Sequence, residues 1–181
     1  MKLYHYDFTG NKTFEKVRDI FCFGCFTGQR FSDIANLQRS DIKGSVWQLR
    51  TAKTKDSLEI PLNRYAIEIL GKYKDQDMIL PVISNQKTNF YIKQICKALG
   101  FNDIIKQTMY RGAERVVFTE PKYEYISMHT ARRTFVTLAL QKGMLQEVIM
   151  EITGHKDYKT FRKYVKITSK EKYTQMKAIW G

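Results

Sequence analysis

The chain has 181 residues, of which 43% are hydrophobic and 27% are charged. This length and composition suit one folded domain with a sizeable core and exclude a disordered chain. Lysine and arginine outnumber aspartate and glutamate by 31 to 18, a formal charge of +13 that suits a phosphate backbone or an anionic membrane surface. The apolar stretches are far shorter than a membrane span and no signal peptide is recognisable, so we expect a cytoplasmic protein with no membrane partner.

The first third of the chain predicts two consecutive helices. Residues 13–27 form an apolar helical pattern that ends at Gly28, and a short helix follows from Ser32 to Leu37. Arg30 is therefore expected in the turn between the two helices. The cysteine pair Cys22 and Cys25 has a C-x-x-C spacing, which also occurs in redox and zinc sites. No second Cys or His pair completes a tetrahedral set, so we interpret both as packing residues on the first helix and expect neither a metal nor a cofactor.

A β-hairpin is expected next. Residues 46–50 and 58–61 are strand-like runs, and the polar segment 52–56 between them is typical of a hairpin tip. Lys53 lies in or beside that tip. Two further helices, 63–74 and 88–99, have the spacing of scaffold elements.

The second half begins with a small β element within residues 108–126, followed by a helix that starts after Ser127 and ends at Gly143. One stripe of this helix carries the residues expected in the core, Ala131, Phe135, Leu138 and Ala139, and a neighbouring face carries His129, Arg132 and Val136. A helix over 145–153, a short helix toward Tyr164 and a tail helix over 169–180 complete the chain.

Metal-independent cleavage of a phosphodiester needs a nucleophile, cationic donors around the phosphate oxygens, and an acid for the leaving oxygen. Five segments contain suitable residues. They are TGQRFSDI at 27–34, the turn with Lys53, SMHTARRTF at 127–135, ITGH at 152–155, and Tyr164 followed by Val165.

The order and spacing of these segments resemble the tyrosine recombinase or phage integrase family. That family's pattern is T-G-x-R-x-[SD/E], a hairpin lysine, H-x-x-R, then G-H and a tyrosine nine residues beyond the last histidine. Tyr164 follows His155 by nine residues, and the resemblance spans roughly residues 13–168. The amino-acid sequences of the first and third motifs, TGQRFSDI and HTARRTF, are most like those of integrases of bacterial mobile elements.

The resemblance implies a role for each matching residue. Arg30 and Arg132 would hold the scissile phosphate, since a planar guanidinium donates two hydrogen bonds at once. His129 and His155 would donate hydrogen bonds or move a proton, and their individual roles stay open. Tyr164, chosen over Tyr158 and Tyr173 by its spacing, would attack the phosphorus and form a 3′-phosphotyrosine.

Three further residues take supporting roles in this comparison. Lys53 would protonate the leaving 5′ oxygen and contact DNA, although Lys55 is an alternative for that amine. Asp33 would support the architecture of the site without reacting. Arg133 would have a structural role or contact the DNA backbone.

The implied fold is α+β and mainly α, the tyrosine recombinase catalytic-domain fold with a small antiparallel β-sheet. We expect one catalytic domain over 1–181, with the family's N-terminal core-binding domain absent. The tail helix within 169–181 carries Tyr173, Met176 and Trp180, an apolar set expected to cover hydrophobic surface of this chain or of a neighbouring subunit.

The implied function is that of a site-specific DNA recombinase that acts on double-stranded DNA in a synaptic tetramer, in association with the bacterial nucleoid. Two alternatives stay open at this point. The first is a type IB topoisomerase-like enzyme that relaxes DNA, and the second is a non-catalytic DNA-binding regulator with the same fold. The sequence does not reveal the DNA target, nor does it separate integration from excision or resolution.

Overall fold

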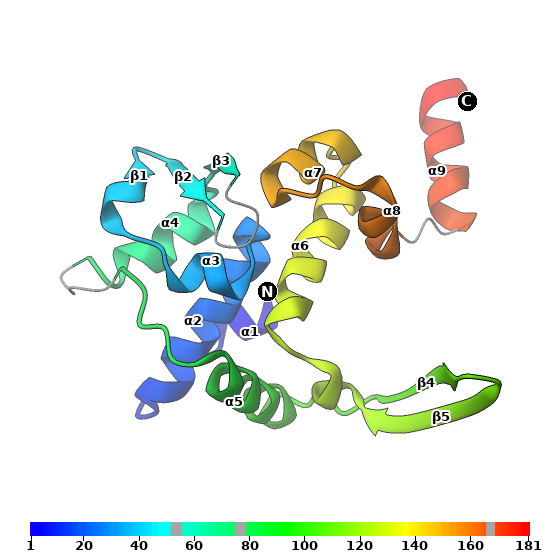
Figure 1. Ribbon diagram of the computed structural model, residues 1–181, viewed down its shortest axis with the longest axis horizontal. Coiled ribbons are helices and arrows are strands. Elements are labelled where there is room, and N and C mark those ends of the chain that lie inside the picture. Colours follow the sequence, from blue (N-terminus) through cyan, green and yellow to red (C-terminus); the bar gives the residue numbers. More distant parts are fainter. Residues whose placement is uncertain (52–55, 75–78, 166–168) are drawn as a thin grey trace.

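The structure is a computed structural model that describes residues 1–51, 56–74, 79–165 and 169–181. Helices predominate, and the strands form two small antiparallel sheets, so the expected α+β, mainly helical fold is confirmed. In Figure 1 the long helix α6 runs between a group of elements from the first half of the chain and the helices of the C-terminal part.

The first half contains the helices α1 to α5 and a three-stranded sheet in the order β1-β2-β3. The predicted hairpin is confirmed, because β2 and β3 pair in register from Val46 opposite Pro61 to Arg50 opposite Ser57. The bounds are α1 (Lys2–His5), α2 (Lys12–Thr27), α3 (Phe31–Ala35), η1 (Arg39–Asp41), β1 (Ile42–Lys43), β2 (Val46–Arg50), β3 (Ser57–Pro61), α4 (Arg64–Gly71) and α5 (Asn85–Ala98).

The helix predicted to begin at Thr88 begins three residues earlier. The side chain of Ser84 accepts a hydrogen bond from Lys87 N and caps the first turn of α5. The helix predicted over 63–74 starts at its expected cap, Asn63, but ends at Gly71. Helix ends depend on local caps, so such shifts of a few residues leave the arrangement unchanged.

The second half contains a two-stranded hairpin and the helices that carry the C-terminal motifs. The β element expected within 108–126 starts earlier, at Ile104, and its strands pair along their whole length. The bounds are β4 (Ile104–Arg111), β5 (Glu114–Pro121), η2 (Lys122–Tyr125), α6 (Met128–Gln141), α7 (Gln146–Thr153), α8 (Tyr158–Phe161), η3 (Arg162–Tyr164) and α9 (Ser169–Trp180).

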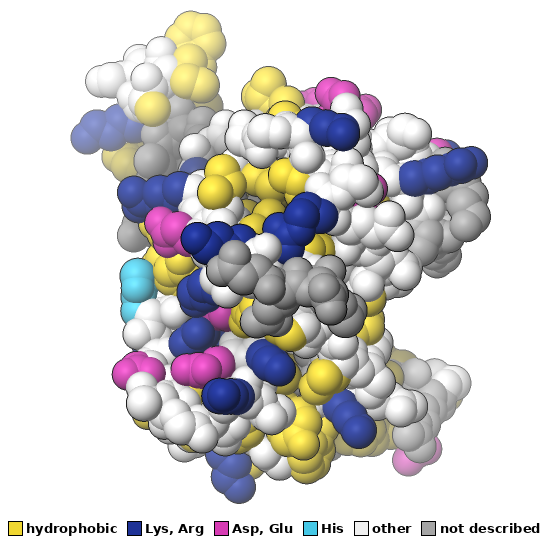
Figure 2. Space-filling view, turned by 90° about the vertical axis from the view of Figure 1, so that its left-hand side faces the viewer, with side chains coloured by type: hydrophobic (Ala, Val, Ile, Leu, Met, Phe, Trp, Pro, Cys, Tyr) yellow, Lys and Arg dark blue, Asp and Glu magenta, His cyan; other side chains and the backbone are white. Residues whose placement is uncertain are grey.

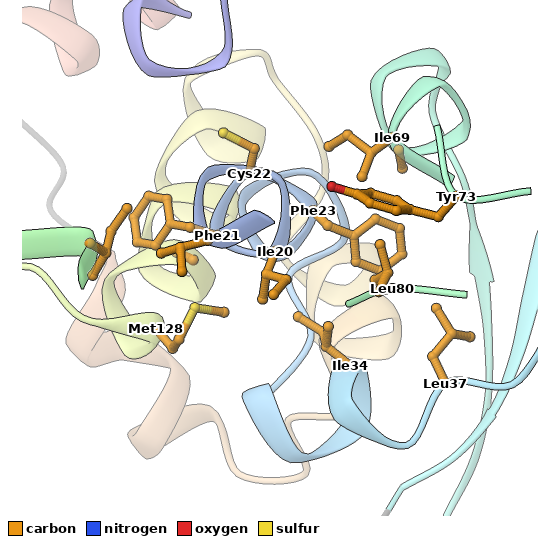
Figure 3. Close-up of a cluster of buried hydrophobic side chains, with 14 of the residues drawn as sticks. Ile20, Phe21, Cys22, Phe23, Ile34, Leu37, Ile69, Tyr73, Leu80 and Met128 are labelled. Carbon is orange, nitrogen blue, oxygen red and sulfur yellow. The ribbon is translucent and has the colours of Figure 1, made fainter. Parts of the chain in front are cut away.

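Helix α2 is the centre of the main core. Every residue from Val17 to Gly24 is buried, as expected for a helix that is surrounded by other elements. In Figure 3 Phe21 points toward the side of Met128, while Phe23 points to the other side, toward Tyr73 and Leu80. The interior of this half is thus built around one helix, which ends beside the first arginine motif.

Both cysteines of the C-x-x-C pair lie on α2, and both are free thiols. Cys22 is buried and Cys25 is partly buried against the main core. Burial raises the pKa of the Cys22 thiol to about 12, which disfavours the reactive thiolate. Their interpretation as packing residues is confirmed. Within the described part of the chain, no three His, Cys, Asp or Glu side chains gather as metal ligands would.

A second, smaller core lies between α6, α7 and α8. Its fully or largely buried members are Val136, Ala139, Ile149 and Phe161. The prediction that Leu138 belongs to the buried stripe of α6 is wrong, since 45% of this residue is exposed. Val136, which we had assigned to the neighbouring face, is buried instead because α7 and α8 cover the opposite side of the helix.

The C-terminal helix α9 stands apart from the other helices (Figure 1). The apolar residues Tyr173, Met176 and Trp180 are 74%, 61% and 80% exposed. The expectation that they cover hydrophobic surface of their own chain is therefore wrong for the single chain. Contact with a neighbouring subunit stays a prediction. No helix in the described part of the chain has the length and apolarity needed to cross a bilayer.

Candidate active site

Arg132 is the anchor of the site. It extends from α6, is only 3% exposed, and donates hydrogen bonds from Nη1 to Gly28 O at 2.9 Å and from Nη2 to Thr153 O at 2.7 Å. Burial, followed by the charge of nearby Arg30, lowers the pKa of Arg132 to about 10, so it still carries its proton at neutral pH. One guanidinium thus joins α6 to the ends of α2 and α7.

Arg30 occupies the N-cap position of α3, in the turn between two helices where we expected it. Its Nη1 lies 3.7 Å from Oδ2 of Asp33, a fully buried carboxylate one turn later on α3. Among the described residues, that Nη1 has no hydrogen-bond partner, although the atom is buried. Two neighbouring guanidinium groups are suited to an anion such as phosphate.

Gly28 allows the close approach of these segments. It ends α2 in the left-handed conformation with φ of 71°. A Cβ atom at this position would lie 2.4 Å from Cδ1 of Phe135 and 2.9 Å from Cγ2 of Thr153. The T-G of the first motif is therefore explained by packing and backbone conformation together.

His155 follows a second left-handed glycine, Gly154, which ends α7. The Nη2 atom of Arg132 lies 3.3 Å from Nδ1 and 3.2 Å from Nε2 of the ring. Burial and then the charges of Arg132, Arg30 and His129 lower the pKa of His155 to about 4. The imidazole is thus neutral at physiological pH.

Tyr164 lies between the two histidines. Its hydroxyl is 3.3 Å from Nε2 of His129, and its ring centroid lies 6.0 Å from that of His129 and 5.5 Å from that of His155. Burial, followed by the charges of Arg133 and Arg132, also lowers the pKa of His129. A neutral imidazole can accept a proton, so the phenol has an acceptor within hydrogen-bond distance.

A hollow of about 360 Å³ lies on the arginine side of the site. Arg30, His129 and Arg132 line it on one side, and it continues along the start of α5 at Asn85 and Asn89. The residues predicted from widely separated motifs, Arg30, Asp33, His129, Arg132, His155 and Tyr164, therefore meet in one region. Arg133 is exposed on α6 beside them.

Lys53, and with it the alternative Lys55, lies outside the described residues, and its place in the site stays a prediction. The chain is described again from Asp56, whose Oδ1 pairs with Nζ of Lys156 at 2.8 Å. Lys156 directly follows His155, so this end of the predicted hairpin tip meets the His155 segment.

Two buried residues were not selected from the sequence. Gln29 is fully buried and donates from Nε2 to Ile152 O at 2.7 Å and to Thr27 O at 3.0 Å, which ties the end of α2 to α7. Thr153 is also fully buried, and its Oγ1 lies 2.7 Å from Nδ1 of His155. Gln29 lies inside the TGQRFSDI segment and Thr153 inside the ITGH segment, but only their contacts distinguish them from ordinary core residues.

Two arginines, two imidazoles and a phenol thus lie in one region, and the two arginines and His129 line its hollow. The Phage integrase family model matches residues 3–171, and the chain belongs to this family. It is 25% identical over 156 residues to a tyrosine recombinase of Thermosipho africanus, covering 85% of this chain and 50% of that protein. It is 24% identical over 164 residues to the tyrosine recombinase XerC of Treponema denticola, covering 86% and 54%.

Solved structures show the same fold. The XerH site-specific recombinase bound to difH substrate matches with a TM-score of 0.65 and 16% identity, over 99% of this chain and 51% of that chain. A lambda integrase dimer bound to a COC' core site matches with a TM-score of 0.66 and 20% identity, over 93% and 60%. The chain spans about half the length of the curated relatives it matches.

Proposed function

We propose that this chain is the catalytic domain of a site-specific DNA recombinase that cuts and rejoins strands through a 3′-phosphotyrosine at Tyr164. The observation that carries the proposal is the position of the Tyr164 hydroxyl. It lies 3.3 Å from His129 Nε2, and its ring lies beside His155, which contacts the buried Arg132. A nucleophile, proton acceptors and cationic donors are therefore neighbours.

Arg30 and Arg132 hold the scissile phosphate in this proposal. Arg132 is held by two backbone carbonyls, and Arg30 is held by its ion pair with the buried Asp33. A bound phosphate would relieve the repulsion between the two guanidinium groups. It would also lie beside two cationic groups that stabilise developing negative charge.

The proton steps follow from the neutral state of both histidines. Tyr164 gives its hydroxyl proton to Nε2 of His129 as its oxygen bonds to phosphorus. The bond from phosphorus to the 5′ oxygen then breaks, and that oxygen takes a proton from a general acid, for which Lys53 remains the candidate. Rejoining is the reverse, with a 5′-hydroxyl of another strand attacking the phosphotyrosine.

Double-stranded DNA is the proposed substrate. The formal charge of +13 suits it, and Figure 2 shows Lys and Arg side chains distributed over one face of the molecule with fewer acidic side chains among them. Two proteins with the same fold were solved on DNA, XerH on difH and lambda integrase as a dimer on its core site. We accordingly propose action with further subunits in a synaptic tetramer, on nucleoid DNA.

Trapping of a covalent adduct tests this function. The protein is incubated with a pool of nicked duplexes of randomised sequence, in which a short fragment diffuses away after cleavage, and is then run on a denaturing gel. We expect an adduct with the wild-type chain and with Tyr158→Phe, a control at an exposed tyrosine on α8. We expect none with Tyr164→Phe.

An adduct that persists in Tyr164→Phe would show that another residue is the nucleophile. Absence of any adduct with the wild-type chain would instead favour a non-catalytic DNA-binding regulator. Plasmid relaxation measured beside two-site recombination separates the remaining alternative, because a type IB topoisomerase relaxes supercoils without pairing two sites.

A further inference from the structure

Thr153, the last residue of α7, makes a contact that fixes the position of one proton. Its Oγ1 lies 2.6 Å from Ile149 O and 2.7 Å from Nδ1 of His155. Two oxygens at 2.6 Å must share a proton, because their lone pairs would otherwise repel each other. The single hydroxyl proton of Thr153 is therefore donated to Ile149 O, and the hydrogen between Oγ1 and Nδ1 comes from the imidazole.

Arg132 contacts the same ring. Its Nη2 lies 3.2 Å from Nε2 and 3.3 Å from Nδ1, so this contact does not distinguish the two tautomers. Nη2 also donates a hydrogen bond to Thr153 O at 2.7 Å. The assignment of the proton therefore rests on Thr153, whose Oγ1 is closer to Nδ1 than Arg132 is to either ring nitrogen.

We propose that Thr153 is a positioning residue that holds His155 with its proton on Nδ1, so that Nε2 of the neutral ring carries no proton. The proposal rests on the proposed function for the role of His155, but not for its tautomer. Thr153 acts through two atoms at once, with its hydroxyl on His155 and its backbone carbonyl on Arg132.

The tautomer decides what His155 can do. An unprotonated Nε2 and a phosphate oxygen both carry lone pairs, so the neutral ring does not donate to the phosphate. His155 instead accepts a proton at Nε2, and it becomes a phosphate donor only after that step. Burial and the nearby Arg132 and Arg30 lower the pKa of His155 and keep the free ring neutral. This agrees with the proposed order of events.

Nitrogen-15 NMR of the histidine side chains, without DNA, reads the tautomer directly. The chain has three histidines, and a His155→Gln variant assigns the relevant signals. Thr153→Val removes the hydroxyl while keeping the size and the backbone carbonyl, and Thr153→Ser restores the hydroxyl. Thr88→Val is the matched control, because Thr88 is also fully buried and donates to the carbonyl four residues earlier, Ser84 O at 3.0 Å.

We expect the wild-type and Thr153→Ser proteins to carry the proton of His155 on Nδ1, and Thr153→Val to lose that preference. Covalent adduct formation should fall about 10-fold to 100-fold in Thr153→Val, the range for partners that orient a functional imidazole. It should be unchanged in Thr88→Val and restored in Thr153→Ser. A wild-type signal from a protonated Nε2 with a bare Nδ1 would overturn the proposal.

Retention of both the tautomer and the rate in Thr153→Val would also overturn it. Because the spectra are recorded on the free protein, the tautomer is read even if no adduct ever forms. Failure of the proposed function and failure of this inference are therefore separate results.

Discussion

The two sides of the candidate site are held very differently. Arg132 is buried, bonds two backbone carbonyls, and lies beside the main core around α2. Tyr164 is half-buried, lies on a short 3-10 turn, and packs against the small core that contains Phe161. The proposed phosphate-binding side is thus held by buried contacts. The proposed nucleophile depends on few buried contacts, so its segment can open locally at a lower free-energy cost. With this arrangement the arginines are already in position when the tyrosine moves into place.

The largest expected effect comes from removing the anchor of the rigid side. Arg132→Ala should slow covalent adduct formation by at least about 10²-fold to 10³-fold, the cost of losing one preorganised donor. It also leaves the carbonyls of Gly28 and Thr153 without their donor. Arg115→Ala is the control, because this arginine is exposed on the β4–β5 hairpin. An Arg132→Ala variant as fast as Arg115→Ala would contradict the assigned role.

Phe161→Ala tests whether the small core beneath Tyr164 unfolds locally, separately from the main core. Loss of this fully buried ring should cost about 3–5 kcal/mol within its own core. We expect hydrogen exchange to accelerate mainly in α7, α8 and η3, together with slower adduct formation. Phe23→Ala, in the main core, is the comparison and should accelerate exchange throughout the chain. Equal, global acceleration in both variants would mean that the two cores unfold as one unit.

Gly28→Ala tests how tightly the rigid side is packed. The added Cβ meets Phe135 and Thr153, and the left-handed backbone adds strain, so we expect a loss of about 3 kcal/mol in unfolding free energy. Gly44→Ala has a similar φ, 60°, but no neighbouring atom within 4 Å, and should cost about 1 kcal/mol. Denaturant unfolding of both variants separates packing from backbone strain. Similar losses would refute the packing argument.

The smallest expected effect is a pH dependence of stability that arises from His155. Its ordinary pKa is about 6.5 and falls to about 4 in the folded chain, so the unfolded chain binds more protons between these values. The contribution of the neutral His155 ring to the unfolding free energy is fully present above about pH 6.5 and is lost as the pH falls toward 4. We expect His155→Gln to flatten the unfolding free energy in that window. Parallel curves of unfolding free energy against pH for the wild type and the variant would show that His155 is not the source of this pH dependence.

Much of the architecture was predictable from local pattern. The apolar run at 13–27 could only be a largely buried helix, and the alternating runs at 46–50 and 58–61 could only pair as a hairpin. The spacing of nine residues between His155 and Tyr164 selected one tyrosine among three candidates. These features depend on neighbours in the chain or on a motif with fixed spacing, so they can be read without coordinates.

Other features depended on which distant segments meet. Leu138 has the periodicity of a core residue, yet it is exposed because α7 and α8 cover a different face of α6. Thr153 and Gln29 resemble ordinary polar residues in the sequence, and only their buried contacts reveal what they hold.

The sequence by itself thus determined the helical fold, the order of the motifs and the candidate residues of the site. The tertiary structure alone decided that Arg132 is buried against two distant carbonyls, that the phenol lies between two imidazoles, and that Thr153 contacts His155. The physical reason is that burial, pKa and hydrogen-bond direction are set by atoms from segments far apart in the chain, which become neighbours only on folding.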